Sequence, residues 1–294
     1  MRYSLGLLIF ASVFLFALPI EAVDLKKKEA NKYTNQDLLK HIVSPSLLFP
    51  TPLSSRYQKI AQAETTQNQE AKAYRLLIEA IQLRKNAQTS LALTKLQLAL
   101  QIFKELNQPF VEGLTLFNIA SIYSDIGKYQ KSLEFYQKAL VIFKQIGSKA
   151  IEAKSLNNIG SVYRNLRKYP EALDYYQQSL AINRSIGEKT VEATNLNNIG
   201  LVYSFLGEYK KALDYYQQSL QIREQVNDKV NKVQTLNNIG YVYSNLKEYK
   251  KALNYWKEAL AIVKQVGDKV VEVTTLKNIG EVYRNLEEYP KALD

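Results

Sequence analysis

The sequence predicts an all-α protein, built as a right-handed superhelix (solenoid) of antiparallel helix-turn-helix repeats. The first observation is a segment that recurs five times at an interval of 40 residues, starting at Thr115, Ser155, Asn195, Thr235 and Thr275. The second is the pattern inside each copy, where two apolar stripes at helical spacing flank a short polar turn. A fixed period of this size indicates stacked units that bury their apolar faces against their neighbours. Such an array presents a long groove, which favours a binding function over a catalytic one.

The first 22 residues differ in composition from the rest of the chain. Arg2 gives a positive start, Leu5–Leu18 is an uncharged apolar run, and Ala22 offers a small residue before a cleavage point. This pattern is typical of a secretory signal peptide, and the run is shorter than the roughly 18 residues of a membrane span. We therefore expect residues 1–22 to be a signal peptide and the protein to be periplasmic or secreted. An uncleaved N-terminal anchor is the alternative.

Two segments precede the clear repeats. Residues 23–56 contain three of the seven prolines and are expected to form an irregular spacer. Residues 57–108 keep the alternation of small and large residues but lose the tyrosines, and we expect them to form a degenerate repeat that caps the array. The small residues Ala80, Ala92 and Ala99 stand 40 positions before Ala120, Ser132 and Ala139.

The unit at 149–188 shows how each repeat is expected to fold. The first helix carries its apolar stripe at Leu156, Ile159 and Tyr163, and the second at Leu173, Tyr176 and Leu180. Pro170 suits the first turn of the second helix, where no backbone donor is needed. Gly187 is expected to end that helix in a left-handed conformation, as are its counterparts Gly147, Asn227 and Gly267. The array is expected to cover residues 109–294, with its last repeat incomplete.

A glycine recurs in the middle of the first helix, at Gly160, Gly200, Gly240 and Gly280. Glycine costs about 1 kcal/mol against alanine at such a place. The repeated cost indicates a close approach of the partner helix, where the small residues Ala172, Ala212, Ala252 and Ala292 are expected to face the glycines. Ala120 occupies the glycine position in the earlier copy.

The pattern resembles the tetratricopeptide repeat family. Leu156 stands where that family often has tryptophan, Ile159-Gly160 matches its Leu-Gly pair, and Tyr163, Ala172 and Tyr176 match the next three positions. Two features depart from the family pattern, because Arg184 and Glu224 stand near the place of the closing proline and the period is 40 instead of the common 34. Both indicate longer helices, as in the extended subtype of kinesin light chains and bacterial scaffold proteins.

The resemblance implies a non-enzymatic scaffold that binds a protein or peptide ligand in its concave groove. The alternative that it implies is a regulatory or substrate-recruiting arm of a longer protein with a C-terminal effector, such as a caspase-like peptidase domain. The resemblance leaves the partner, the oligomeric state and any continuation past Asp294 undetermined.

Asparagines supply the candidate binding site. They recur in the first helices at Asn118, Asn158, Asn198, Asn238 and Asn278, and three more precede them at Asn157, Asn197 and Asn237. Asparagine is a mediocre helix former, so helix propensity does not explain it there. Its amide joins a donor and an acceptor, the pairing that one peptide unit needs. These amides are expected either to hold a ligand backbone, or to form hydrogen bonds between adjacent repeats or simply be solvated. Arg164 and Arg284 are expected to line the same groove and to favour acidic ligands.

Other chemistry finds little support in the sequence. The chain has no cysteine and one histidine, which excludes disulfides and thiolate metal sites and gives no metal-ligand cluster. We expect no catalytic residues, no metal and no cofactor. The net charge of +11 is spread without a dense basic block, so we expect no nucleic-acid partner, and no membrane contact beyond the signal segment. The recurring tyrosines, such as Tyr163 and Tyr169, fit helix packing better than base stacking.

Overall fold

The computed structural model describes residues 53–287, and every regular element in that range is an α-helix. The prediction of an all-α solenoid is confirmed. The segment 1–22, predicted as a signal peptide, lies outside the described residues, as do residues 23–52 of the predicted spacer and the last residues, 288–294.

Turns of two or three residues join the successive helices. Their bounds are α4 Leu53–Lys85, α5 Thr89–Glu105, α6 Pro109–Asp125, α7 Tyr129–Gln145, α8 Lys149–Asn165, α9 Tyr169–Ile186, α10 Lys189–Phe205, α11 Tyr209–Gln225, α12 Lys229–Asn245, α13 Tyr249–Val266 and α14 Lys269–Asn285. The most extensive contacts join α4 with α5, α6 with α7, α8 with α9, α10 with α11 and α12 with α13. These are the antiparallel pairs that the sequence predicts, and α14 is the first helix of a sixth.

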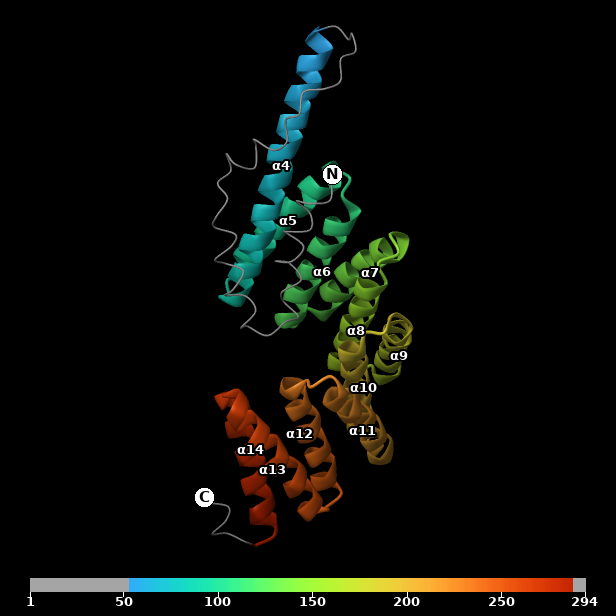
Figure 1. Cartoon of the computed structure of the whole chain (residues 1–294), viewed down its shortest axis with the longest axis vertical. Coiled ribbons are helices and arrows are strands. Elements are labelled where there is room, and N and C mark those ends of the chain that lie inside the picture. The colour runs from blue at the N-terminus through green and yellow to red at the C-terminus, as the bar shows by residue number, and fades with distance from the viewer. Residues whose placement is uncertain (1–52, 288–294) are drawn as a thin grey trace.

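The pairs follow a curve, which gives the array an inner and an outer face. Figure 1 shows α4–α6 and α12–α14 lying to the same side of the middle helices α7–α11. The first helices of neighbouring pairs touch one another, α8 with α10 and α10 with α12, whereas contacts between second helices are weaker. The first helices therefore form the inner face and the second helices form the outer face.

Every turn among the described residues holds one residue with a left-handed backbone. The positions recur at intervals of 20 residues from Ala87 to Glu287. Gly147, Gly187, Asn227 and Gly267 are among them, which confirms the predicted helix ends. The sequence did not reveal that the turn inside each pair also requires a residue with a left-handed backbone. Arg167 and Lys247 adopt φ values of 59° and 60° there, at positions where neighbouring repeats have Gly127 and Gly207.

The mid-helix glycines are required by the aromatic residue of the second helix. A Cβ at Gly160 would lie 2.8 Å from the Tyr176 ring and 3.2 Å from the backbone oxygen of Ala172. The predicted close approach is therefore confirmed, but the nearest neighbour of the glycine is the aromatic ring rather than alanine. Gly240 is the tightest case, because its Cβ would lie 2.6 Å from Nε1 of Trp256.

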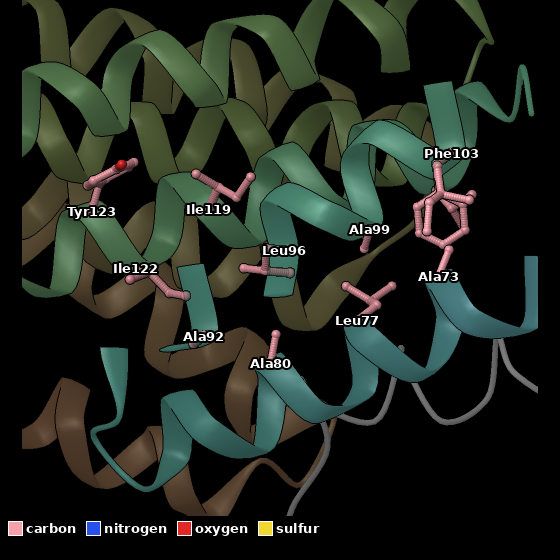
Figure 2. Packing of buried hydrophobic residues seen from close by; sticks show 12 residues of the cluster. Ala73, Leu77, Ala80, Ala92, Leu96, Ala99, Phe103, Ile119, Ile122 and Tyr123 are labelled. Carbon is pink, nitrogen blue, oxygen red and sulfur yellow. The ribbon is translucent and has the colours of Figure 1, made fainter. Parts of the chain in front are cut away.

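The helices α4 and α5 pack against each other and against α6. In Figure 2, Ala73, Leu77 and Ala80 of α4 face Ala92, Leu96 and Ala99 of α5, with residues of α6 completing the cluster. Ala80, Ala92 and Ala99 are fully buried, as are Ala120, Ser132 and Ala139 at the positions 40 residues later. The helix α4 begins at Leu53, so its first four residues belong to the segment for which an irregular spacer was expected.

Candidate functional site

A front row of asparagines lies half-buried along the inner helices. It consists of Asn118, Asn158, Asn198, Asn238 and Asn278. Nδ2 of Asn158 donates to the hydroxyl of Tyr136 in the preceding repeat (3.1 Å). Nδ2 of Asn198 and Nδ2 of Asn238 donate to side-chain oxygens of the preceding repeat, at 3.4 Å and 3.1 Å. In these three residues, the amide donor is used to join neighbouring repeats.

The acceptors of two of these bonds belong to a rear row, formed by Asn157, Asn197 and Asn237. Asn157 Oδ1 accepts from Asn198, and Asn197 Oδ1 accepts from Asn238. Each rear-row amide is also joined to a buried residue of the following repeat. The bonds link Asn157 with the amide of Asn195 (2.7 Å), Asn197 Oδ1 with Thr235 Oγ1 (3.2 Å), and Asn237 Oδ1 with Thr275 Oγ1 (3.3 Å).

In most of these amides, only the oxygen or only the nitrogen forms a hydrogen bond. Among the hydrogen bonds of the described residues, Oδ1 of Asn198 and Oδ1 of Asn238 have no donor. Nδ2 of Asn197 and Nδ2 of Asn237 likewise have no acceptor. The asparagines therefore form hydrogen bonds between adjacent repeats, which is one of the alternatives that the sequence leaves open. Some of their acceptors and donors remain unpaired. That these groups bind a ligand stays a prediction.

A row of aromatic polar groups from the second helices reaches the same face. The hydroxyl of Tyr136 is hydrogen-bonded to Ser121 (2.8 Å) and that of Tyr176 to Ser161 (2.9 Å), both serines of first helices. Trp256 donates through Nε1 to the backbone oxygen of Asn237 (3.2 Å). Gly160 and Gly240, which lack a side chain, leave room for the rings of Tyr176 and Trp256, whereas Tyr136 packs against Ala120. Sequence reasoning missed this row, because it assigned these aromatic residues to the core alone.

One cation lies close to these hydroxyls. Burial raises the pKa of Tyr176 and Tyr216, and the guanidinium of Arg164 offsets part of that rise in both. Arg164 donates to the neighbouring Asn165 (3.3 Å) and forms no ion pair among the described residues. Arg284, the other arginine predicted for the groove, is exposed and lies 3.6 Å from Glu281.

A lysine that the sequence did not single out adds a second unpaired cation. The ammonium of Lys154 lies 5.7 Å from the ring centre of Phe117, and no carboxylate of the described residues pairs with it. Desolvation by the surrounding side chains lowers the pKa of Lys154, although the residue reaches solvent. Lys154 and Arg164 both belong to α8, so the middle of the inner face carries positive charge that the protein does not neutralise.

The junctions between pairs contain most of the remaining buried charge. Glu192 is 4% exposed and accepts hydrogen bonds from Arg184 and Lys189 (2.9 and 2.8 Å), which together lower its pKa despite its burial. Arg223 is 1% exposed and donates to Ser219 (3.0 Å), but its Nη1 has no hydrogen-bond partner. Burial lowers the pKa of Arg223 to about 10.

Among the described residues, no group of three or more His, Cys, Asp or Glu could hold a metal ion. None of the described helices combines the length and the apolar character that a membrane crossing requires.

Comparison with protein families identifies the repeat. Tetratricopeptide repeat family profiles match residues 115–143, 151–225 and 232–294. The chain belongs to the tetratricopeptide repeat family. This confirms the resemblance drawn from Gly160, Tyr163 and their counterparts. No curated protein is significantly similar to the chain in sequence.

Solved structures share this repeat fold at low sequence identity. Aspartyl phosphate phosphatase F from Bacillus subtilis has a TM-score of 0.70 and 14% identity, covering 99% of this chain and 92% of that one. RapI without ligand has a TM-score of 0.64 and 20% identity, covering 79% and 65%. A Rap protein complexed with competence and sporulation factor has a TM-score of 0.59 and 18% identity, covering 76% and 72%. Similarity at these identities establishes the fold alone.

Proposed function

We propose that this tetratricopeptide repeat protein is a non-enzymatic scaffold that binds an extended segment of a partner protein along its inner face. The observation that carries the proposal is the set of half-used amides. Oδ1 of Asn198 and Oδ1 of Asn238 accept no hydrogen bond among the described residues, and Nδ2 of the half-buried Asn237 donates none. Nδ2 of Asn197 is also unpaired, although that residue is only 1% exposed. An acceptor next to a donor complements the N–H and C=O of a peptide backbone.

The spacing of the helices suits such a ligand. Packed helices lie about 8–10 Å apart, and an extended peptide rises about 3.3 Å per residue. Each repeat would therefore meet about every third residue of the ligand. Backbone bonds of this kind give affinity with little sequence preference, so preference must arise from groove residues that differ between repeats.

The unpaired cations favour an acidic segment. Lys154 and Arg164 lie on α8 with no acidic partner among the described residues. The lowered pKa of Lys154 reflects desolvation, and a ligand carboxylate would offset that penalty. A binding role also fits the Rap protein of the same fold whose structure was solved as a complex with competence and sporulation factor.

The test uses dodecapeptides selected from a random phage-displayed library, with affinities measured by fluorescence anisotropy. We expect the triple change Asn158→Ala, Asn198→Ala and Asn238→Ala to weaken binding by about tenfold or more, equivalent to about 1.4 kcal/mol. These amides also link repeats, so a fall in thermal stability accompanies the change and requires its own control.

The matched control is the double change Thr235→Val and Thr275→Val. It removes the two threonine bonds to the rear row while leaving every front-row amide in place. We expect it to lower stability by about 1 kcal/mol per bond and to leave peptide affinity unchanged. Equal losses of affinity in the triple variant and the control would show that the asparagines act only through stability.

We also propose that the protein is exported, on the evidence of Arg2, the apolar run Leu5–Leu18 and Ala22. Expression in a secreting bacterial host should yield a mature protein that begins near Val23. N-terminal sequencing of the product measures this directly, and an unprocessed cytosolic product contradicts it. A membrane-bound product that keeps residues 1–22 favours the anchor instead.

A further inference from the structure

A pocket opens between α12, the end of α13 and the start of α14. It has a volume of about 370 Å³, near the lower end of the range for small-ligand sites. Its apolar lining consists of five valines: Val230, Val233, Val263, Val266 and Val271. Side chains of Asn237 and Asn238 belong to the same lining, so the pocket adjoins the asparagine rows of the inner face.

The residue at position 263 explains why an apolar pocket forms at this junction. Each preceding second helix has its own buried residue at the equivalent position: Phe103, Phe143, Asn183 and Arg223. The two phenylalanines and the arginine are much larger than valine. Asn183 is polar, and its amide donates to the backbone of Ser179 (2.9 Å). Val263 is therefore the one residue in this series that is both apolar and short.

The polar groups next to the pocket define what can occupy it. Asn237 has an unpaired Nδ2 and Asn238 has an unpaired Oδ1 among the bonds of the described residues. Val233 and Val263 are buried, whereas Val230 and Val266 are exposed, and Asn231, Gln234, Asp268 and Thr274 add polar groups to the lining. A charged or strongly polar group placed against the two buried valines would lose its hydration without gaining a partner there. An amino-acid residue with a large apolar side chain satisfies both conditions, since its side chain can contact the valines while its backbone reaches the two amides.

We propose that this pocket is the anchor subsite of the groove, and that it takes one leucine-like or phenylalanine-like side chain of the bound segment. The inference rests on the proposed peptide-binding function and adds a position-specific preference to it. The α12–α14 end of the groove then selects an apolar residue, while the cations of α8 select acidic residues farther along the same ligand. The predicted ligand has an acidic stretch and one large apolar residue.

The experiment uses capped amino acids as probes, because each contains one side chain and two peptide units. N-acetyl-leucinamide, N-acetyl-phenylalaninamide and N-acetyl-alaninamide are titrated into the full chain with valine methyl groups labelled for NMR. The leucine or the phenylalanine probe should bind at least about tenfold tighter than the alanine probe, because each buried CH₂ strengthens binding about fourfold. The shifted signals should be those of the five lining valines.

Two variants test the location of binding. Val263→Phe fills the pocket with the residue that Phe103 and Phe143 place at the equivalent position, and it should abolish the preference for large probes. Val230→Asp introduces a charge at the pocket and should do the same. Its matched control is Val270→Asp, in the same Asp-Lys-Val context one repeat later, where the valine does not line the pocket. Val270→Asp should leave probe binding unchanged.

The outcomes separate this inference from the proposed function. Absence of a preference for large probes overturns the pocket, as does a preference that survives Val230→Asp or that Val270→Asp removes equally. Val230→Asp and its control carry the test if Val263→Phe fails to fold. If library peptides bind the groove and are unaffected by Val230→Asp, the anchor fails while peptide binding stands. If the probes bind as expected and no peptide does, the groove proposal fails instead.

Discussion

The interface inside a helix pair and the junction between pairs are built in opposite ways. Inside the pair, the same contact recurs, a mid-helix glycine against an aromatic ring: Gly160 with Tyr176, Gly200 with Tyr216 and Gly240 with Trp256. At the junction, the equivalent buried position changes from repeat to repeat: Phe103, Phe143, Asn183, Arg223 and Val263. The pair interface therefore sets the shape of the unit, whereas the junction makes each unit different from its neighbours.

Ion pairs at the junctions show the same individuality. Arg184 at the end of α9 pairs with Glu192 at the start of α10 (2.9 Å). One repeat later the signs are reversed, because Glu224 pairs with Lys232 (2.8 Å). Nearly identical repeats could stack against the wrong neighbour. Because the charges of the two ion pairs are reversed, a stack shifted by one repeat would place like charges next to each other. In each pair one side chain is about half exposed and its partner is largely buried. A wrong neighbour would leave the buried charge without its partner, so the pairs favour the correct stacking.

The largest effect is expected where the constant interface is broken. Gly240→Ala places a methyl group 2.6 Å from Nε1 of Trp256 and threatens its bond to the Asn237 oxygen. We expect a loss of about 2 kcal/mol in the free energy of unfolding, because the clash outweighs the gain in helix propensity. Urea unfolding measures the loss. In a double-mutant cycle with Trp256→Leu, the two changes should be strongly non-additive. An alanine variant as stable as the parent would disprove the close contact.

A smaller effect is expected at the variable junction. Glu224→Lys sets two cations against each other, although Lys232 keeps its second partner, Glu258 (2.9 Å). We expect a loss of about 0.5–1 kcal/mol that shrinks in 0.5 M salt, since exposed charges are screened. Glu224→Gln is the control, as it removes the pair without adding repulsion and should cost less. If both variants show the same salt dependence, repulsion is not the cause.

The smallest effect at neutral pH is expected from Tyr216→Phe. Tyr216 is 1% exposed, and Leu201 replaces the serine that bonds the equivalent tyrosine hydroxyls. Burial raises the pKa of Tyr216 above its usual 10. The neutral phenol therefore contributes stability that is present below about pH 10 and is lost as the pH rises toward the folded-state pKa.

The phenylalanine variant should match the parent at pH 7 and lose less stability between pH 10 and 12. Chemical denaturation at a series of pH values gives both curves. Tyr241→Phe, at a side chain that is 55% exposed, is the control and should follow the parent. Parallel curves for the parent and Tyr216→Phe would mean that this hydroxyl does not titrate with unfolding.

Local sequence patterns predict the fold well because each pattern recurs in several copies of the repeat. Helix stripes, the proline at Pro170 and left-handed ends such as Gly187 are properties of a few adjacent residues, and all three are found as expected. The left-handed turn at Arg167 is not evident from sequence, since arginine gives no sign of a positive φ. It is evident only by comparison with Gly127 and Gly207 at the same position.

The site is predictable only in its outline. The sequence places asparagines on one helix face, but their partners lie 38 or 41 residues away, and that offset depends on how pairs stack. The same limit applies to the Tyr176 hydroxyl, which bonds Ser161 on the inner face while its ring packs closely against Gly160. The pocket beside Val263 depends on three helices at once, and a valine in an apolar stripe looks the same whether or not space remains next to it.

The hydrogen bonds that asparagine side chains form between repeats also determine how the array responds to force. They lie on the inner side of the curve, at Asn157, Asn197 and Asn237, while the extensive apolar contacts lie between the helices of each pair. Straightening the curve therefore stretches these bonds before it separates any pair. Resistance to straightening therefore comes mainly from the inner edge of the array, and loss of these hydrogen bonds would make the array more flexible.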